Sequence, residues 1–104
     1  MINSKGGWVY ILTNMYNRVL YTGVTSQLVK RIKQHKSKKY PFSFTARYRV
    51  HKLVYFVAFP FIVEAIEHEK FIKGKSRAFK LALIEEANPF WEDLFPLIED
   101  EFDY

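Results

Sequence analysis

The feature that most constrains the fold is a pair of short apolar segments near the start of the chain. Residues 8–13 and 19–24 are rich in Val, Ile, Leu and aromatic side chains, and each segment carries a tyrosine, Tyr10 or Tyr21. The polar stretch between them contains two asparagines, which favour tight turns. This pattern predicts a β-hairpin that brings the two tyrosines onto neighbouring strands.

The rest of the chain alternates between helical and extended patterns. A basic helix is predicted over about residues 27–36, with Leu28 and Ile32 as its apolar stripe. The elements expected after it are an irregular segment at 37–48, a strand at 50–59, helices at 61–73 and 76–87, and a short helix within 91–100. The order β-β-α-β-α-α indicates an α+β fold, in which helices flank a small three-stranded antiparallel sheet.

We expect one domain over residues 1–104, with its core at about 8–95 and an acidic C-terminal tail at about 99–104. In the helix at 61–73, four side chains are expected to face inward: Ile62, Ala65, Ile66 and Phe71. The absence of cysteine excludes disulfides, thiolate catalysis and cysteine-based zinc sites. Neither a signal-peptide pattern nor an apolar run of about 20 residues is present, so we expect a cytoplasmic protein.

Charge divides the chain into two unlike halves. Residues 1–63 contain eleven Lys and Arg and no acidic residue, whereas residues 64–104 contain five Lys and Arg against eleven Asp and Glu. A surface of one sign attracts polyanions, and Lys and Arg contacts release counterions from a phosphate backbone. We therefore expect a nucleic-acid partner. The alternative is that the charge only keeps a small basic protein in solution.

Four side chains near this basic half could act on a phosphate group. Arg31 and His35 are four residues apart, so a helix places them on one face, close to Tyr10 and Tyr21 of the hairpin. Simpler interpretations exist, with the tyrosines at the edge of the core and the helical pair on a solvated face. The first acidic residues of the chain occur in the helix predicted at 61–73. One of them, Glu69, is either functional or a charged surface residue.

A family resemblance extends this interpretation. Five short motifs occur in order: Val9-Tyr10, Tyr21-Thr22-Gly23, Arg31-x-x-x-His35, Glu69 and Asn88-Pro89. Over roughly residues 8–95 the chain resembles the GIY-YIG nuclease superfamily, and in particular its small stand-alone bacterial branch of predicted endonucleases. The resemblance implies a metal-dependent endonuclease that hydrolyses phosphodiester bonds in DNA. DNA repair or recombination is the expected role, and restriction, mobile-element and competence roles remain open alternatives.

The resemblance also implies roles for individual residues. Tyr21 would take a proton from the attacking water, and Arg31 would hold the scissile phosphate. Tyr10 and His35 resemble a supporting pair that orients water and phosphate. Asn88 resembles a polar residue that braces the site from behind, although Asn88 followed by proline also fits a turn that ends a helix.

Glu69 resembles the acidic residue that holds one divalent ion, Mg²⁺ or Mn²⁺. A single carboxylate completed by water and phosphate oxygens suits Mg²⁺, which dehydrates reluctantly. Three positions depart from the family pattern: Trp8 replaces the first glycine, Thr22 replaces isoleucine, and Val24 stands where some relatives carry lysine. The last departure removes one means of lowering the pKa of the catalytic tyrosine.

Seven basic side chains are expected to line a nucleic-acid groove beside the site: Lys30, Lys33, Lys36, Lys38, Lys39, Arg47 and Arg49. The aromatic rings of Tyr40, Phe42, Phe44 and Tyr48 are interleaved with them. Exposed rings could stack on unpaired bases, or they could fill the core under the loop. Duplex, flap, branched, single-stranded DNA and RNA all fit this pattern, and a monomer is slightly favoured over a dimer.

Two other functions are compatible with the sequence. The chain could be a nucleic-acid-binding module that kept the scaffold but lost efficient turnover. It could also dock a partner protein through Trp91, Leu94 and Phe95 in its acidic half, although these side chains would more commonly seal the core.

Overall fold

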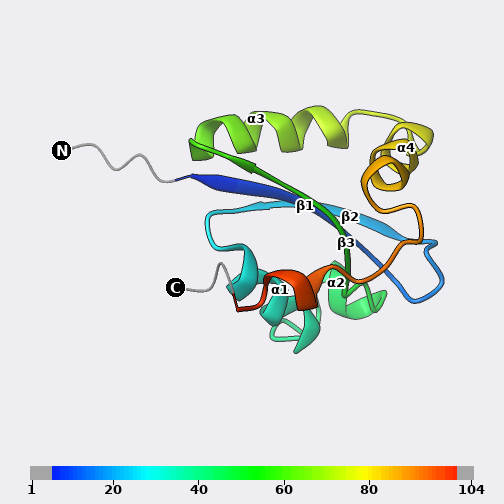
Figure 1. The fold of residues 1–104 in the computed structure, drawn as a ribbon. Helices are drawn as coiled ribbons and strands as arrows, with labels where there is room; N and C mark the ends of the chain where they lie inside the picture. The colour runs from blue at the N-terminus through cyan, green and yellow to red at the C-terminus, as the bar shows by residue number, and fades with distance from the viewer. Residues whose placement is uncertain (1–5, 101–104) are drawn as a thin grey trace.

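A three-stranded antiparallel sheet organises the computed structural model, which describes residues 6–100 (Figure 1). Its strands are β1 (Gly7–Thr13), β2 (Leu20–Thr25) and β3 (Lys52–Phe59), and their order in the sheet is β2-β1-β3. In the hairpin Tyr10 pairs with Gly23, and Leu12 pairs with Tyr21. The predicted α+β class, the three strands and their antiparallel pairing are confirmed.

Helices cover both faces of the sheet (Figure 1). They are α1 (Leu28–Lys36), α2 (Phe44–Arg47), α3 (Ile62–Lys73), α4 (Arg77–Ala87) and α5 (Phe95–Ile98). Only α2 was not predicted; like α5 it has four residues, too few for a periodic pattern, and it lies in a segment expected to be irregular. Its start is marked by Ser43, whose hydroxyl accepts a hydrogen bond from the Ala46 N–H. No helix described within residues 6–100 is both long and apolar enough to cross a membrane.

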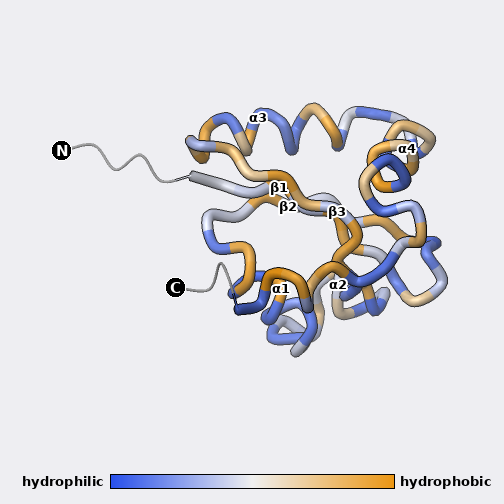
Figure 2. The backbone as a smooth tube through the Cα atoms, viewed as in Figure 1, coloured by the Kyte–Doolittle hydropathy of each residue, from blue (hydrophilic) through white to orange (hydrophobic). Residues whose placement is uncertain are grey.

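The alternation of β1 sends its side chains into two separate cores. Val9 and Ile11 pack with residues of α3 and α4, whereas Tyr10 and Leu12 pack with residues of α1 and α5. In Figure 2 apolar residues follow β3 and alternate with hydrophilic residues along α3, as expected when one helix face lies on a sheet. The active-site candidates of the hairpin therefore share the α1 face of the sheet.

The inner face of α3 differs from the prediction. Ala65, Glu69 and Ile72 are buried, whereas Ile66 and Phe71 are 38% and 49% exposed. The expectation that Ile66 and Phe71 face inward was wrong, because the buried positions follow the spacing i, i+4, i+7 from Ala65. This rotation of the helix places the Glu69 carboxylate on the inner side.

The segment proposed for partner docking is part of the core. Trp91 and Phe95 are each only 9% exposed and belong to the two core clusters, and Leu94 packs against one of them. These side chains seal the core and leave little surface for a partner at these positions. Residues 101–104 of the expected acidic tail lie outside the described part of the chain.

Candidate active site

The hairpin register brings Tyr10 directly across Gly23. A Cβ atom added at Gly23 would overlap the ring carbon Cζ and the hydroxyl oxygen of Tyr10. The tyrosine is only 1% exposed, so its ring has little room to move aside. Glycine in the second motif is thus required here by close approach of a side chain.

Replacing Gly23 with alanine is expected to destabilise the protein by about 1–3 kcal/mol, the usual cost of overpacking a well-filled core. Urea denaturation would measure the change. Gly74→Ala is the matched control, because a Cβ there meets only ordinary contacts at 3.6 Å and 3.7 Å and the backbone φ of −80° suits alanine. Equal stability of the two variants would contradict the packing of Tyr10 over Gly23.

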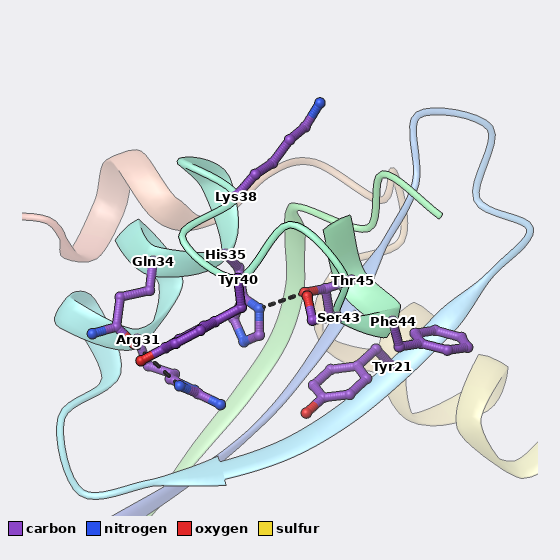
Figure 3. A pocket seen from close by; sticks show the side chains of 9 residues that line it. All are labelled: Tyr21, Arg31, Gln34, His35, Lys38, Tyr40, Ser43, Phe44 and Thr45. Atoms are coloured by element: carbon purple, nitrogen blue, oxygen red, sulfur yellow. Dashed lines mark hydrogen bonds between the residues drawn. The ribbon is translucent and has the colours of Figure 1, made fainter. Parts of the chain in front are cut away.

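A chain of hydrogen bonds joins Tyr10 to α1 and α2. The Tyr10 Oη atom lies 3.0 Å from Nε2 of His35, and His35 Nδ1 lies 2.9 Å from Oγ1 of Thr45 (Figure 3 shows the second bond). Arg31 also interacts with the Tyr10 phenol and favours its charged form. Thr45 is 4% exposed, so it is a buried polar partner that the sequence did not single out.

The protonation states determine which group donates in each of these hydrogen bonds. Burial, and then the charge of Arg31, lower the pKa of His35 to about 4, so its imidazole is neutral at pH 7. Burial raises the pKa of Tyr10 and the nearby Tyr21 adds to the rise, while Arg31 only partly offsets it. Arg31 can then donate to the phenol, the phenol to Nε2, and Nδ1–H to Thr45. Tyr10 is therefore suited to positioning its neighbours rather than to accepting a proton.

Tyr21 and Arg31 line a pocket on the α1 face of the sheet (Figure 3). The other lining residues are Gln34, His35, Lys38, Tyr40, Ser43, Phe44 and Thr45. Arg31 is oriented by donation from its Nη1 to Gln34 Oε1 at 3.1 Å, and it also interacts with the Tyr10 phenol. Gln34, Ser43 and Thr45 were missed in the sequence because they fit no motif; the capping pattern at Ser43 was the only local signal.

Glu69 lies on α3 close to the same edge of the sheet. Its Oε2 accepts from Lys73 Nζ at 2.7 Å, and its side chain is 11% exposed. Lys73 in turn lines a shallow groove together with Tyr21 and Lys80. The pKa of Tyr10 is raised mainly by burial and by the nearby Tyr21, and the negative charge of Glu69 adds to this rise. Glu69 is therefore near enough for its charge to act on Tyr10, although the pocket itself is lined by other residues.

The donor set around Glu69 limits which metal could bind. Within residues 6–100, no group of three or more His, Asp or Glu side chains could hold an ion. A single inward-facing carboxylate fits an ion that keeps most of its water ligands, which is the behaviour of Mg²⁺. Lys73 is 53% exposed and can leave the carboxylate when a divalent cation replaces its charge.

Comparison with known proteins identifies the scaffold. Residues 6–82 match the family model of the GIY-YIG catalytic domain. The chain belongs to the GIY-YIG family. This is a nuclease superfamily, so a nucleic acid is the substrate class that membership implies, and its members typically use a divalent metal.

Two relatives resemble this GIY-YIG chain over most of its length. A UPF0213 protein of Syntrophus aciditrophicus (strain SB) is 39% identical over 82 residues, which cover 79% of this chain and 92% of the relative. The solution NMR structure of a UPF0213 protein from Bacillus halodurans is 32% identical with a TM-score of 0.54, and covers 89% of this chain and 97% of that one.

Asn88 occupies a different part of the GIY-YIG fold. Its Nδ2 donates to the carbonyls of Val54 at 3.1 Å and Glu92 at 2.8 Å, and its Oδ1 accepts from the Glu92 N–H at 3.1 Å. These bonds tie the turn after α4 to β3, which β1 separates from β2. The structure thus favours the turn interpretation of Asn88 and does not bring it into the pocket with Tyr21 and Arg31.

The structure places the seven predicted basic side chains in several different surroundings. Lys38 lines the pocket, Lys30 lines a shallow groove next to Arg31, and Lys33 is exposed on α1. Lys39 and Arg47 lie over the rings of Tyr40 and Tyr48, and Arg49 lines a groove at the hairpin tip.

Lys36 differs from the others. Its Nζ lies 2.6 Å from the Asp93 carboxylate and donates to the His51 carbonyl at 3.0 Å. The same ammonium group lies 5.2 Å from the centroid of the Phe95 ring. These contacts join α1 to the C-terminal segment and pair the Lys36 charge with Asp93 in a partly exposed ion pair; a contact of Lys36 with nucleic acid stays a prediction.

Proposed function

We propose that this chain is a metal-dependent endonuclease that hydrolyses phosphodiester bonds in DNA, with Tyr21 as the group that activates water. The observation that supports this most directly is that Tyr21, Arg31 and His35 line one pocket, while the buried Tyr10 phenol hydrogen-bonds His35 and interacts with Arg31. A phosphate in that pocket would meet a fixed cation and a phenol at the same time.

Arg31 is the proposed phosphate-binding group. A guanidinium offers forked donors that match phosphate oxygens, and donors fixed in advance stabilise the charge that develops during displacement. Partial burial disfavours its charged form, but the hydrogen bond to Tyr10 and the nearby phenols raise the pKa of Arg31 overall. Gln34 and Tyr10 orient the group, so little reorganisation is needed when the substrate binds.

Tyr21 is the proposed proton acceptor. Its ring packs against Phe44, with 6.0 Å between ring centroids, and against the edge of His35 at 5.6 Å. A free phenol titrates near 10, so the role requires cations that favour the phenolate. Arg31 in the pocket, and Lys73 and Lys80 in the neighbouring groove, supply positive charge on both sides of the ring.

Glu69 is the residue that would hold the divalent ion. When bound, such an ion supplies positive charge at the phosphate and at its own coordinated water. Glu69 is buried, and the more exposed Lys73 pairs with its carboxylate at 2.7 Å.

A nucleic-acid-binding module without turnover is the second candidate. The ion pair between Glu69 and Lys73 favours it, because an ammonium group already neutralises the proposed metal ligand. The two functions differ in one result, which is cleavage that depends on a divalent cation.

Cleavage of end-labelled linear and branched DNA in Mg²⁺ or Mn²⁺, with EDTA as control, tests the proposal. Arg31→Lys is expected to slow cleavage about 10- to 100-fold, because lysine keeps the charge but loses the forked donors and the bond to Gln34. Arg77→Lys, an exposed exchange of the same kind at the start of α4, should cleave at the wild-type rate. Binding without cleavage on every substrate would select the binding module.

A further inference from the structure

A further groove lies at the tip of the hairpin. It is lined by Asn14, Met15, Tyr16, Tyr48, Arg49 and His51. Met15 and Tyr16 are 69% and 73% exposed, although both are large apolar side chains. Exposed apolar groups that gather in one place, bordered by polar ones, commonly mark a binding surface.

The turn that carries these side chains is internally braced. Asn14 Oδ1 accepts from the Arg18 N–H at 2.8 Å, and the Asn14 carbonyl accepts from the Asn17 N–H at 3.0 Å. Asn17 and Arg49 both adopt positive φ angles, 57° and 56°; asparagine tolerates this conformation, whereas it is unfavourable for arginine. Backbone held in this way presents Tyr16 and Arg49 at defined positions.

Aromatic contacts connect this groove to the Tyr21 pocket. The ring centroids of Tyr48 and Phe44 are 4.7 Å apart, and those of Phe44 and Tyr21 are 6.0 Å apart. Phe44 and Tyr48 are each 45% exposed, so these rings pack on one another and still present surface to solvent. We call Tyr21, Phe44 and Tyr48 the aromatic ridge.

Positive charge accompanies the ridge. The Arg47 guanidinium lies 5.7 Å from the centroid of the Tyr48 ring, and Arg49 is two residues later in the chain. Asp93 acts electrostatically on His51, but its carboxylate is paired with Lys36 at 2.6 Å. Since residues 1–63 contain no acidic residue, the hairpin tip and α2 form a cationic and aromatic surface.

We propose that the hairpin-tip groove is a subsite for an unpaired nucleotide of a nucleic-acid strand that runs along the aromatic ridge from the Tyr21 pocket. The placement of the scissile phosphate in that pocket rests on the proposed function. Aromatic side chains stack on bases of any sequence, and this requires base faces that a duplex keeps covered. Tyr16 and Tyr48 would stack on the base, and Arg47 and Arg49 would pair with its phosphates. The inference deepens the proposed function by naming a substrate class, a strand with unpaired nucleotides.

The test is fluorescence anisotropy with a labelled oligothymidine single strand and with a blunt duplex of equal length, both in EDTA. Tyr16→Ala is expected to weaken single-strand binding about fivefold or more, and to change duplex binding less than about twofold. Tyr16→Phe keeps the ring and should bind as the wild type does. Phe61→Ala is the matched control: this ring is 49% exposed and lies beyond Phe59, which pairs with Gly7 at the other end of β1.

Unchanged single-strand binding of Tyr16→Ala, or equal losses for single strand and duplex, would overturn the subsite. The cleavage assay in Mg²⁺ separates this result from the fate of the proposed function. Selective loss of single-strand binding with no cleavage of any substrate would leave the subsite standing and remove the nuclease. If the wild type cleaved unpaired strands and Tyr16→Ala bound and cleaved them equally well, the nuclease would stand and the subsite would be removed.

Discussion

Replacing Glu69 with glutamine is expected to reduce DNA cleavage by about a thousandfold or more while leaving the protein folded. The amide keeps the size of the side chain but loses the charge that a hard divalent cation requires. An ion that neutralises charge in the transition state contributes several kcal/mol, which corresponds to a loss of about this size. Glu69 is the buried carboxylate whose charge acts on Tyr10, so its loss also changes the electrostatics of the pocket.

Glu67→Gln is the matched control for this variant, because it makes the same change at an exposed position of α3. Thermal unfolding of both variants would confirm that the fold is retained. Binding of Mn²⁺, followed by its electron paramagnetic resonance signal, gives a readout that does not depend on activity and should weaken only in Glu69→Gln. Cleavage by Glu69→Gln at the wild-type rate, or equal losses in both variants, would remove Glu69 from the metal site.

The hairpin and the helices that follow it could be predicted because their signals are local. Apolar alternation, the polar turn and the helical periodicity all lie within windows of about ten residues. The spacing of Arg31 and His35 likewise predicted that both would face one surface, and the structure places both in the pocket.

The different roles of the two tyrosines could not be read from the sequence in the same way. Tyr10 and Tyr21 occupy similar apolar segments, but β3 pairs with β1 and makes β1 the central strand. Tyr10 is therefore buried under α1, whereas Tyr21 remains half-buried on the edge strand β2. That difference arises from strand order, which is a non-local property.

Long-range pairing also produced two polar contacts that the sequence did not show. Lys36 is neutralised by Asp93, 57 residues later, and no local pattern indicates this pair. Thr45 supports His35 from a helix of only four residues within a segment expected to be irregular. In both cases a polar side chain finds its partner only after the chain has folded, so the sequence shows a candidate without its neighbour.

Tyr21→Phe is expected to slow cleavage by about 100- to 10,000-fold, the range attributed to proton transfer by a positioned side chain. Phenylalanine keeps the ring contacts with Phe44 and His35, so the pocket should retain its shape and substrate binding should change little. Single-turnover rates and the affinity for DNA in EDTA would separate the chemical step from binding. The expected result is a loss confined to the rate.

Two further variants make the assignment of the base specific. Tyr55→Phe removes a hydroxyl from a half-buried tyrosine that packs on the α3 face of the sheet, and it should cleave normally. Tyr10→Phe removes a hydroxyl that lies between Arg31 and His35, so it should disturb the position of Arg31 and weaken binding as well as rate. If Tyr21→Phe cleaved normally and Tyr10→Phe lost only the chemical step, the proton acceptor would be Tyr10. A buried phenol with a raised pKa is poorly suited to that task, whereas Tyr21 has both the access to the pocket and the surrounding positive charge that the task requires.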